Sequence, residues 1–171
     1  MPVSPADADD LYRATRESLV EMSPWLPFAH QDYSIKETRD FLKKRCPQSW
    51  KKDTEYAFKI IDPKDNSFIG MCGLNAIDFE NHRANLGYWI RTSRTGEGVA
   101  PAATLLLAKW GFKIARLRRI EIIVATGNQR SQLVAEKAGA HREGVLRNRL
   151  HMHDKYHDAV MYSLIPQDLE T

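Results

Sequence analysis

The sequence predicts an α+β fold, with a mixed and mainly antiparallel sheet of six to seven strands flanked by four helices. Three observations lead to this prediction. Two helix-like segments open the chain, three strand-like segments with short polar turns follow, and a strand–helix–strand unit then suggests a pair of parallel strands. The length of 171 residues suits a single domain, residues 1–171, that buries a core of its own.

Two helices are expected before the first strand. Ser4 is a good N-cap, so the first helix should run from there to about Met22. Two prolines in the segment 23–28 end it. The pattern Ser34-Ile-Lys-Glu37 is a capping box, from which a second helix should continue towards Trp50.

The rest of the chain alternates between strand-forming and helix-forming segments. The expected strands span residues 56–61, 68–79, 84–92, 120–124, 140–151 and 156–165. Helices are expected over 99–116 and 129–138, the second of them stopped by Gly139. The apolar face predicted for the helix 99–116 consists of Val99, Ala103, Leu106, Trp110 and Ile114.

The composition, 43% apolar and 27% charged, is that of an ordinary globular protein. No apolar run approaches the length of a membrane span, and the acidic N-terminus does not resemble a secretory signal. Cys46 and Cys72 form no disulfide framework, so a cytoplasmic location is expected, and Cys72 is interpreted as a core residue. The net charge of +3 is too small to indicate nucleic-acid binding, although it suits an anionic cofactor.

The strongest chemical signal is the segment Arg94-Thr-Gly-Glu-Gly-Val-Ala100, between a predicted strand and a predicted helix. Gly96 and Gly98 allow a ligand to approach the backbone, and the free N–H groups of the next helical turn favour phosphate. Arg94 and Thr95 can add a charge and a hydroxyl donor. A simple glycine-rich turn explains the motif equally well, whereas the Walker and dinucleotide-binding patterns do not fit it.

The order of elements and this loop resemble the GNAT family of acyl-CoA N-acyltransferases, and more closely its RimJ/RimL-like branch. Segments similar to that branch occur in order along most of the chain: PWLP (24–27), GYWI (87–90), NQRS (128–131), EKAGA (136–140), EG (143–144) and YHD (156–158). One departure is Thr95, which stands where the family's phosphate motif has Gln or Arg. The family's first strand precedes the first helix, so here it should be very short.

The resemblance implies that acetyl-CoA is the co-substrate and that no metal is needed. Backbone groups of Ile90, Arg91 and Thr92 would then pair with the pantetheine arm. The N–H groups of the glycine-rich loop would hold the pyrophosphate, with Arg94 and Thr95 beside them; these N–H groups belong to Gly96, Glu97, Gly98, Val99 and Ala100. The resemblance also places the Asn128 side chain on the pantetheine and makes Ser131 the donor to the departing thiolate, although Asn128 could equally be an N-cap alone.

For the acceptor, the resemblance implies a wall containing Trp25 and Phe28 and a floor at Tyr88, although Trp25 and Phe28 could simply pack a helix–helix corner. The expected reaction is acetyl transfer to the α-amino group of a protein or peptide N-terminus. A small amine such as an antibiotic or amino acid, and a non-catalytic acyl-CoA-binding module, remain alternatives, and a homodimer is a further expectation. No base is assigned, because Leu150 stands where some relatives have Glu, and Glu21 and His30 are weak candidates.

Overall fold

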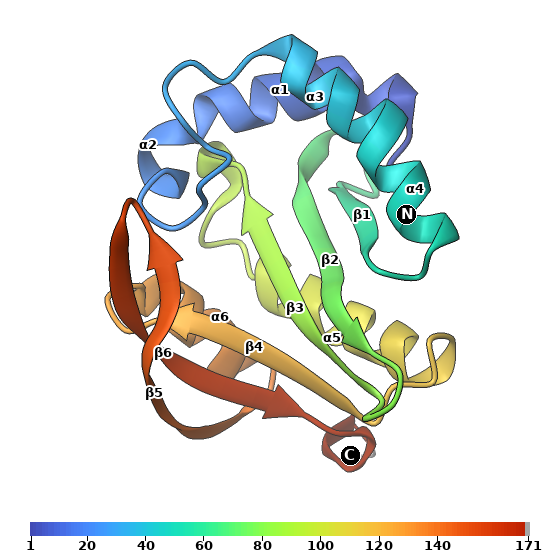
Figure 1. Ribbon diagram of the computed structural model, residues 1–171. Helices are drawn as coiled ribbons and strands as arrows, with labels where there is room; N and C mark the ends of the chain where they lie inside the picture. Colours follow the sequence, from blue (N-terminus) through green and yellow to red (C-terminus); the bar gives the residue numbers. More distant parts are fainter. Residues whose placement is uncertain (170–171) are drawn as a thin grey trace.

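The structure is a computed structural model that describes residues 1–169 (Figure 1). One sheet of six strands, in the order β1-β2-β3-β4-β6-β5, forms its centre. The strands are β1 (Tyr56–Ile61), β2 (Phe68–Asp78), β3 (Arg83–Ile90), β4 (Arg119–Ala125), β5 (His141–Met152) and β6 (Lys155–Leu164). The helices are α1 (Ala8–Glu17), α2 (Leu19–Met22), α3 (Ile35–Asp40), α4 (Cys46–Lys51), α5 (Val99–Lys113) and α6 (Gln129–Lys137).

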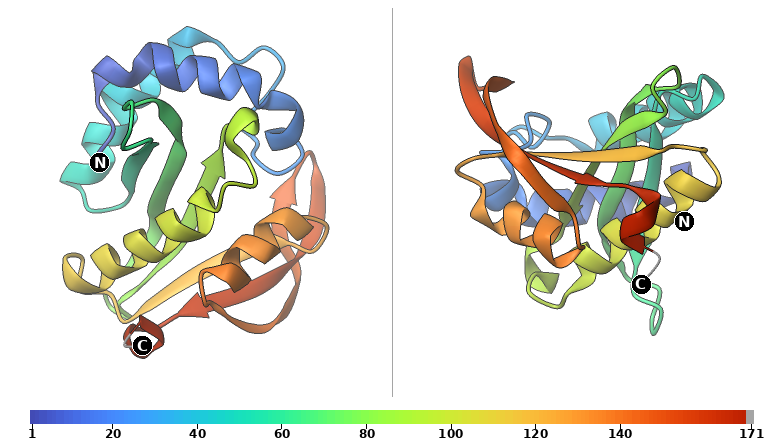
Figure 2. Two further views of the ribbon diagram at one scale, coloured as in Figure 1. Left: turned by 180° about the vertical axis from the view of Figure 1, so that it is seen from behind. Right: turned by 90° about the horizontal axis from the view of Figure 1, so that it is seen from below.

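Helices pack on both faces of this sheet. Ala57 and Met71 belong to the cluster formed with α1, whereas their chain neighbours Tyr56 and Cys72 belong to the cluster formed with α5. Because successive side chains of a strand point to opposite faces, α1 and α5 lie on opposite sides of β1 and β2. Seen from behind, α5 and α6 lie next to each other across the back of the sheet (Figure 2).

The strand pairing confirms the mixed, mainly antiparallel sheet. β1 with β2, β2 with β3, β4 with β6, and β5 with β6 are antiparallel, whereas β3 and β4 are parallel and linked through α5. The parallel contact is short, because only residues 83–85 of β3 pair with residues 119–121 of β4. Beyond that contact the two strands diverge (Figure 1).

The expected short first strand is a single bridge between Pro2 and Phe58, beside β1. The first predicted helix begins with a 3₁₀ turn, Pro5–Asp7, and is interrupted at Ser18, between α1 and α2. The Ser18 hydroxyl donates to the carbonyl oxygen of Ala14 at 2.8 Å, a bond that bends helices. Four predicted helical segments therefore become six named helices in the described residues.

The second predicted helix starts at its capping box, in which the Ser34 N–H donates to Glu37 at 2.9 Å and the Glu37 N–H donates to Ser34 Oγ at 3.4 Å. It continues through a π-helical turn, Phe41–Arg45, into α4. Pro47 in α4 explains the wider turn, since proline has no N–H to donate and its ring crowds the preceding turn.

The predicted apolar face of α5 was wrong in two places. Leu106 is 68% exposed and Ile114 is 58% exposed. The residues of α5 that are buried are Ala103, Thr104, Leu107, Ala108 and Gly111. A Cβ on Gly111 would lie 2.9 Å from Ile120 Cδ1 of β4, so the helix packs on the sheet through its small residues.

Cys46 and Cys72 are both free thiols and both buried. This confirms the interpretation of Cys72 as a core residue. None of the helices in residues 1–169 combines the length and apolarity needed to cross a bilayer.

Candidate active site

The divergence of β3 from β4 leaves backbone groups of β3 without strand partners. Arg91 N–H donates to Ile69 O of the β2 side at 2.8 Å. Backbone groups alternate in direction along an antiparallel strand, so those of Ile90 and Tyr88 face β4 instead. β4 has already turned away at this level, because its pairing with β3 ends at Glu121. A ligand amide can therefore pair with Ile90.

The three residues after Ile90 are held by residues at the end of the first helix. Thr92 N–H donates to Ser18 Oγ at 3.0 Å, and Ser93 N–H donates to Glu17 Oε1 at 2.9 Å. Arg91 forms an ion pair with Glu17, which lowers the pKa of Glu17 to about 2. The predicted pantetheine contacts of Arg91 and Thr92 thus involve N–H groups that already have partners within the chain.

The glycine-rich loop leads into α5 with its N–H groups free. Gly96 has φ 85° and Gly98, the N-cap of α5, has φ 76°. Both are left-handed conformations that favour glycine, and an added Cβ at either position would meet nothing within 4 Å. Within residues 1–169 the N–H groups of residues 96–100 have no hydrogen-bond partner. The loop therefore has the form of an open anion cradle.

Arg94 and Thr95 support the loop from within. The Arg94 guanidinium pairs with Asp62 at 2.7 Å and with Glu97 at 2.8 Å. The pKa of Asp62 is lowered by the Lys64 N–H and by Arg94, and that of Glu97 is lowered by Arg94. Thr95 Oγ1 donates to Thr92 O at 2.9 Å. In this geometry both side chains brace the cradle, and their predicted contact with phosphate would require a change of partner.

Tyr88, Asn128 and Ser131 meet across the β3–β4 gap. The Tyr88 hydroxyl donates to Ser131 O at 2.8 Å and lies 3.0 Å from Ser131 Oγ. Asn128 caps α6, because its Oδ1 accepts the Ser131 N–H at 3.1 Å. Burial raises the pKa of Tyr88 to about 12, so the phenol keeps its proton at neutral pH. The gap thus brings three of the predicted residues together, and the hydroxyls of Tyr88 and Ser131 lie within hydrogen-bond distance of each other.

A cavity of about 880 Å³ lies on the other side of β3, between the sheet and the helices α1, α3 and α4. Phe28 and Tyr88, predicted for the acceptor site, both line it. Trp25 lies elsewhere, since a Cβ on Gly127 would be 3.3 Å from its ring atom Cη2. The indole therefore packs on the loop that precedes Asn128. The turn of the β5–β6 hairpin contacts the segment after α2, because the His153 ring lies 2.8 Å from Ser23 O.

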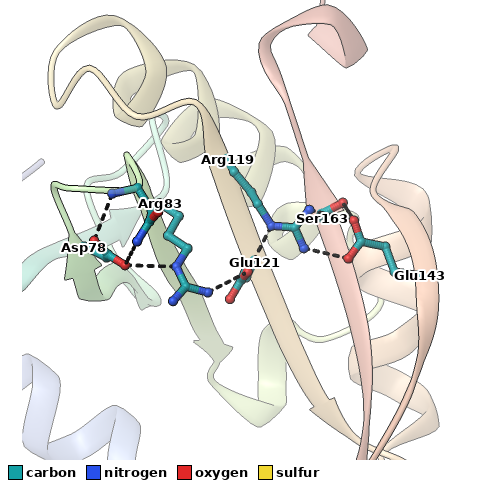
Figure 3. A network of polar contacts seen from close by, with 7 residues as sticks. Asp78, Arg83, Arg119, Glu121, Glu143 and Ser163 are labelled. Carbon is teal, nitrogen blue, oxygen red and sulfur yellow. Dashed lines mark hydrogen bonds and ion pairs between the residues drawn. The ribbon is translucent and has the colours of Figure 1, made fainter.

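A chain of charged residues crosses the sheet where β3 and β4 are still paired (Figure 3). Arg119 of β4 contacts Glu121 at 2.9 Å and Glu143 of β5 at 2.6 Å. Arg83 of β3 contacts Asp78 at 3.2 Å and Glu121 at 3.6 Å. Because these contacts span β2 to β5, they join the two halves of the sheet below the point of divergence.

The weak base candidates have partners of their own. Glu21 accepts a hydrogen bond from Thr92 Oγ1 at 3.0 Å, and His30 lies 2.8 Å from Glu37. Leu150 is in β5, paired with His157. Among the described residues no group of three or more His, Cys, Asp or Glu side chains is placed to hold a metal ion.

Sequence reasoning missed Glu17 and Ser18, which position the end of β3. They lie 74 residues or more from the groups they contact. The interruption of a helix by serine was a local signal, but nothing near either residue indicates its distant partner.

Comparison with known proteins agrees with this geometry. The family model "Acetyltransferase (GNAT) domain" matches residues 1–141. "Putative ribosomal N-acetyltransferase YdaF" of Bacillus subtilis (strain 168) is 31% identical, over 98% of this chain and 91% of its own. "Ribosomal-protein-serine acetyltransferase" of Escherichia coli (strain K12) is 31% identical, over 64% of this chain and 62% of its own. Mycobacterium smegmatis RimJ in complex with CoA-disulfide has the same fold, with a TM-score of 0.90 at 24% identity, covering 99% of this chain and 82% of its own.

The fold and the cradle define an acyl-CoA-dependent transferase. The chain belongs to the GNAT acetyltransferase family. It is an N-acetyltransferase that uses acetyl-CoA, similar to RimJ/RimL-type enzymes, as the sequence resemblance predicted.

Proposed function

We propose that the protein acetylates the α-amino group of a protein or peptide N-terminus. The observation that supports this most directly is the volume of the cavity, about 880 Å³, whose lining includes both Tyr88 on β3 and Lys52 after α4. A site of this size accepts several residues of an extended chain, more than a compact amine requires. The names of the relatives, a ribosomal N-acetyltransferase and a ribosomal-protein-serine acetyltransferase, favour the same acceptor. A cytoplasmic location fits such an acceptor.

The residues present fit acetyl-CoA, because the free N–H groups of residues 96–100 form an anion site at the end of an unpaired strand edge. In this proposal those groups bind the pyrophosphate, and the backbone of Ile90 pairs with the pantetheine. Asn128 would add its amide Nδ2, since its Oδ1 already caps α6. Acetyl-CoA supplies an activated thioester, so the protein need only position the amine and stabilise charge.

Ser131 is the group that we assign to the leaving thiolate. Tyr88 donates its only proton to Ser131 O, so in the 3.0 Å contact between the two hydroxyls Ser131 is the donor and can turn its proton to another acceptor. Turning that hydroxyl towards the β3–β4 gap would stabilise the developing thiolate. Tyr88 and Asn128 hold Ser131 from two sides, which fixes its position at low entropic cost.

A small-molecule amine is the second candidate acceptor, and one observation favours it. The cavity carries three carboxylates, Glu37 and Asp40 of α3 and Glu55 just before β1, which would attract a compact cation. Each of them already pairs with a basic side chain, namely His30, Lys44 or Arg45. The neutralised carboxylates make the peptide acceptor the better fit.

A panel of amines tests the proposal. Purified protein is given acetyl-CoA and either peptides with different N-terminal residues or polyamines, aminoglycosides and free amino acids, and the release of CoA thiol is followed. We expect kcat/KM to be highest for peptides with a free N-terminus, and N-terminally blocked copies of the same peptides should be inert. Faster turnover with any small amine than with every peptide would refute the proposed acceptor.

A further inference from the structure

The acceptor cavity is lined by one amide side chain, Asn75, which is hydrogen-bonded to a second amide, Asn85, and the proposed function uses neither. Asn75 of β2 and Asn85 of β3 are directly opposite each other in the antiparallel register. Asn85 also pairs with Glu121 at the last level where β3 and β4 are joined. The two amides therefore lie at the level where the strands begin to separate.

The hydrogen bonding of the pair leaves one donor available to the cavity. Asn85 Nδ2 donates to Asn75 Oδ1 at 3.1 Å, and this bond orients the Asn75 amide so that its Nδ2 remains free. Asn75 and Gly87 both line the cavity. Asn75 Nδ2 is 4.0 Å from the position that a Cβ on Gly87 would occupy, and it is the nearest atom to that position. The free Asn75 N–H group therefore faces the part of the cavity where Gly87 has no side chain.

The backbone beside Asn75 is irregular in a way that redirects side chains. The pairing of β2 with β3 shifts between Asn75 and Asp78, and Ala76 has a φ of 48°. A left-handed conformation is strained for alanine, and bulges often occur beside active sites, where they turn a side chain towards its target. In addition, Asn85 Oδ1 is buried without a hydrogen-bond partner in the described residues, an unfavourable arrangement for a purely structural pair.

We infer that Asn75, oriented by Asn85, binds the first peptide carbonyl of the acceptor, the group next to the attacking α-amine. A primary amide donor suits a carbonyl oxygen, and the contact places the amine beside Tyr88, the neighbour of Gly87 on β3. Asn75 is then a specificity-determining residue: it selects an amine that carries an adjacent amide over an amine that does not. This inference rests on the proposed function, because it assumes a polypeptide acceptor.

The test combines a substrate change with a residue change. A peptide from the amine panel is compared with its alkene isostere, in which a carbon–carbon double bond replaces the first peptide unit. In the wild type we expect the isostere to lower kcat/KM at least about tenfold. In Asn75→Ala the peptide should lose a similar factor, and the isostere should lose nothing further, because the two changes remove the same contact. Asn85→Ala should give a smaller loss in the same direction.

Gln48→Ala is the matched control, since Gln48 is an amide lining the same cavity from α4. It should leave the ratio of peptide to isostere unchanged, and the Kd for CoA should be unchanged in every variant. Equal losses for peptide and isostere in Asn75→Ala would refute the inference and leave the proposed function intact. A wild type that acetylates small amines but no peptide would refute the proposed function and the inference together.

Discussion

The two sides of β3 are built from different parts of the chain. The cofactor side consists mainly of backbone groups, namely the N–H groups of residues 96–100 and the unpaired edge at Ile90. The acceptor side consists of side chains from α1, α3, α4 and three strands. Backbone groups are the same for any sequence that keeps the conformation, whereas a side-chain cavity changes with each substitution. The comparison suggests a constant cofactor site and a variable acceptor site on one scaffold.

The largest effect is expected for Ser131→Ala, the one side chain to which we assign chemistry on the cofactor side. Loss of the donor to the thiolate should lower kcat by roughly 100-fold. The Asn128 cap on the Ser131 N–H is retained, so the melting temperature and the Kd for CoA should not change. Steady-state kinetics with calorimetry measures both, and an unchanged kcat would remove Ser131 from the mechanism.

Gly98→Ala tests directly whether the cradle is made of backbone. An added Cβ opposes the left-handed φ that the loop needs to present its N–H groups, so we expect the Kd for CoA to rise about tenfold or more by isothermal calorimetry. Gly139→Ala is a matched control, because Gly139 has a similar φ of 80° and equally open space, but follows α6. If both variants weaken CoA equally, the effect is conformational and the cradle is not the site.

Glu17→Gln weakens the contacts by which the Glu17 side chain holds Arg91 and Ser93 at the end of β3. Loss of the charged partner of Arg91 should lower the free energy of unfolding by about 1–3 kcal/mol at pH 7. The pKa of Glu17 is lowered from 4.5 to about 2, so its contribution is complete above about pH 4.5 and is lost as the pH falls towards 2. Urea unfolding should show the same difference from wild type at pH 7 and pH 5, and a smaller difference at pH 3. Glu80→Gln, at an exposed position, should show no such difference at any pH.

The smallest effect is expected for Arg83→Gln in the charged chain that joins the sheet halves. The Arg83 side chain is 48% exposed, so its two ion pairs are screened and should contribute less than about 1 kcal/mol by urea unfolding. Arg119→Gln should cost more, since Arg119 binds Glu143 through two hydrogen bonds of 2.6 Å. A larger loss of unfolding free energy for Arg83→Gln than for Arg119→Gln would mean that the ion pairs of β3, rather than those of β4, mainly join the two halves of the sheet.

Sequence patterns predict the helices and strands whose signals are local. The limits of β1 were predicted to the residue, and the capping box at Ser34 marked the start of its helix, because both signals are local. The buried face of α5 could not be predicted from periodicity, since it packs through alanines and Gly111 while Leu106 is exposed. The bulge at Ala76 also has no signal, as alanine is not a residue that favours positive φ.

The candidate site also combines residues that the sequence predicts with contacts that it does not. Ser131, Tyr88 and Asn128 are predicted by the resemblance, and the structure places them together. The contacts that position them depend on pairs far apart in the chain, such as Glu17 with Arg91 and Trp25 with Gly127. No short segment contains both members of such a pair, so sequence alone could not indicate them.

The burial of both cysteines has a practical consequence for every assay that follows released CoA. Burial raises the pKa of the Cys46 thiol to about 12 and that of the Cys72 thiol to about 11, so little reactive thiolate forms on the folded protein. A chromogenic disulfide reagent should therefore respond to product and not to the enzyme. When the chain opens, two thiols per molecule become reactive, and the same reagent then reports the rate of unfolding.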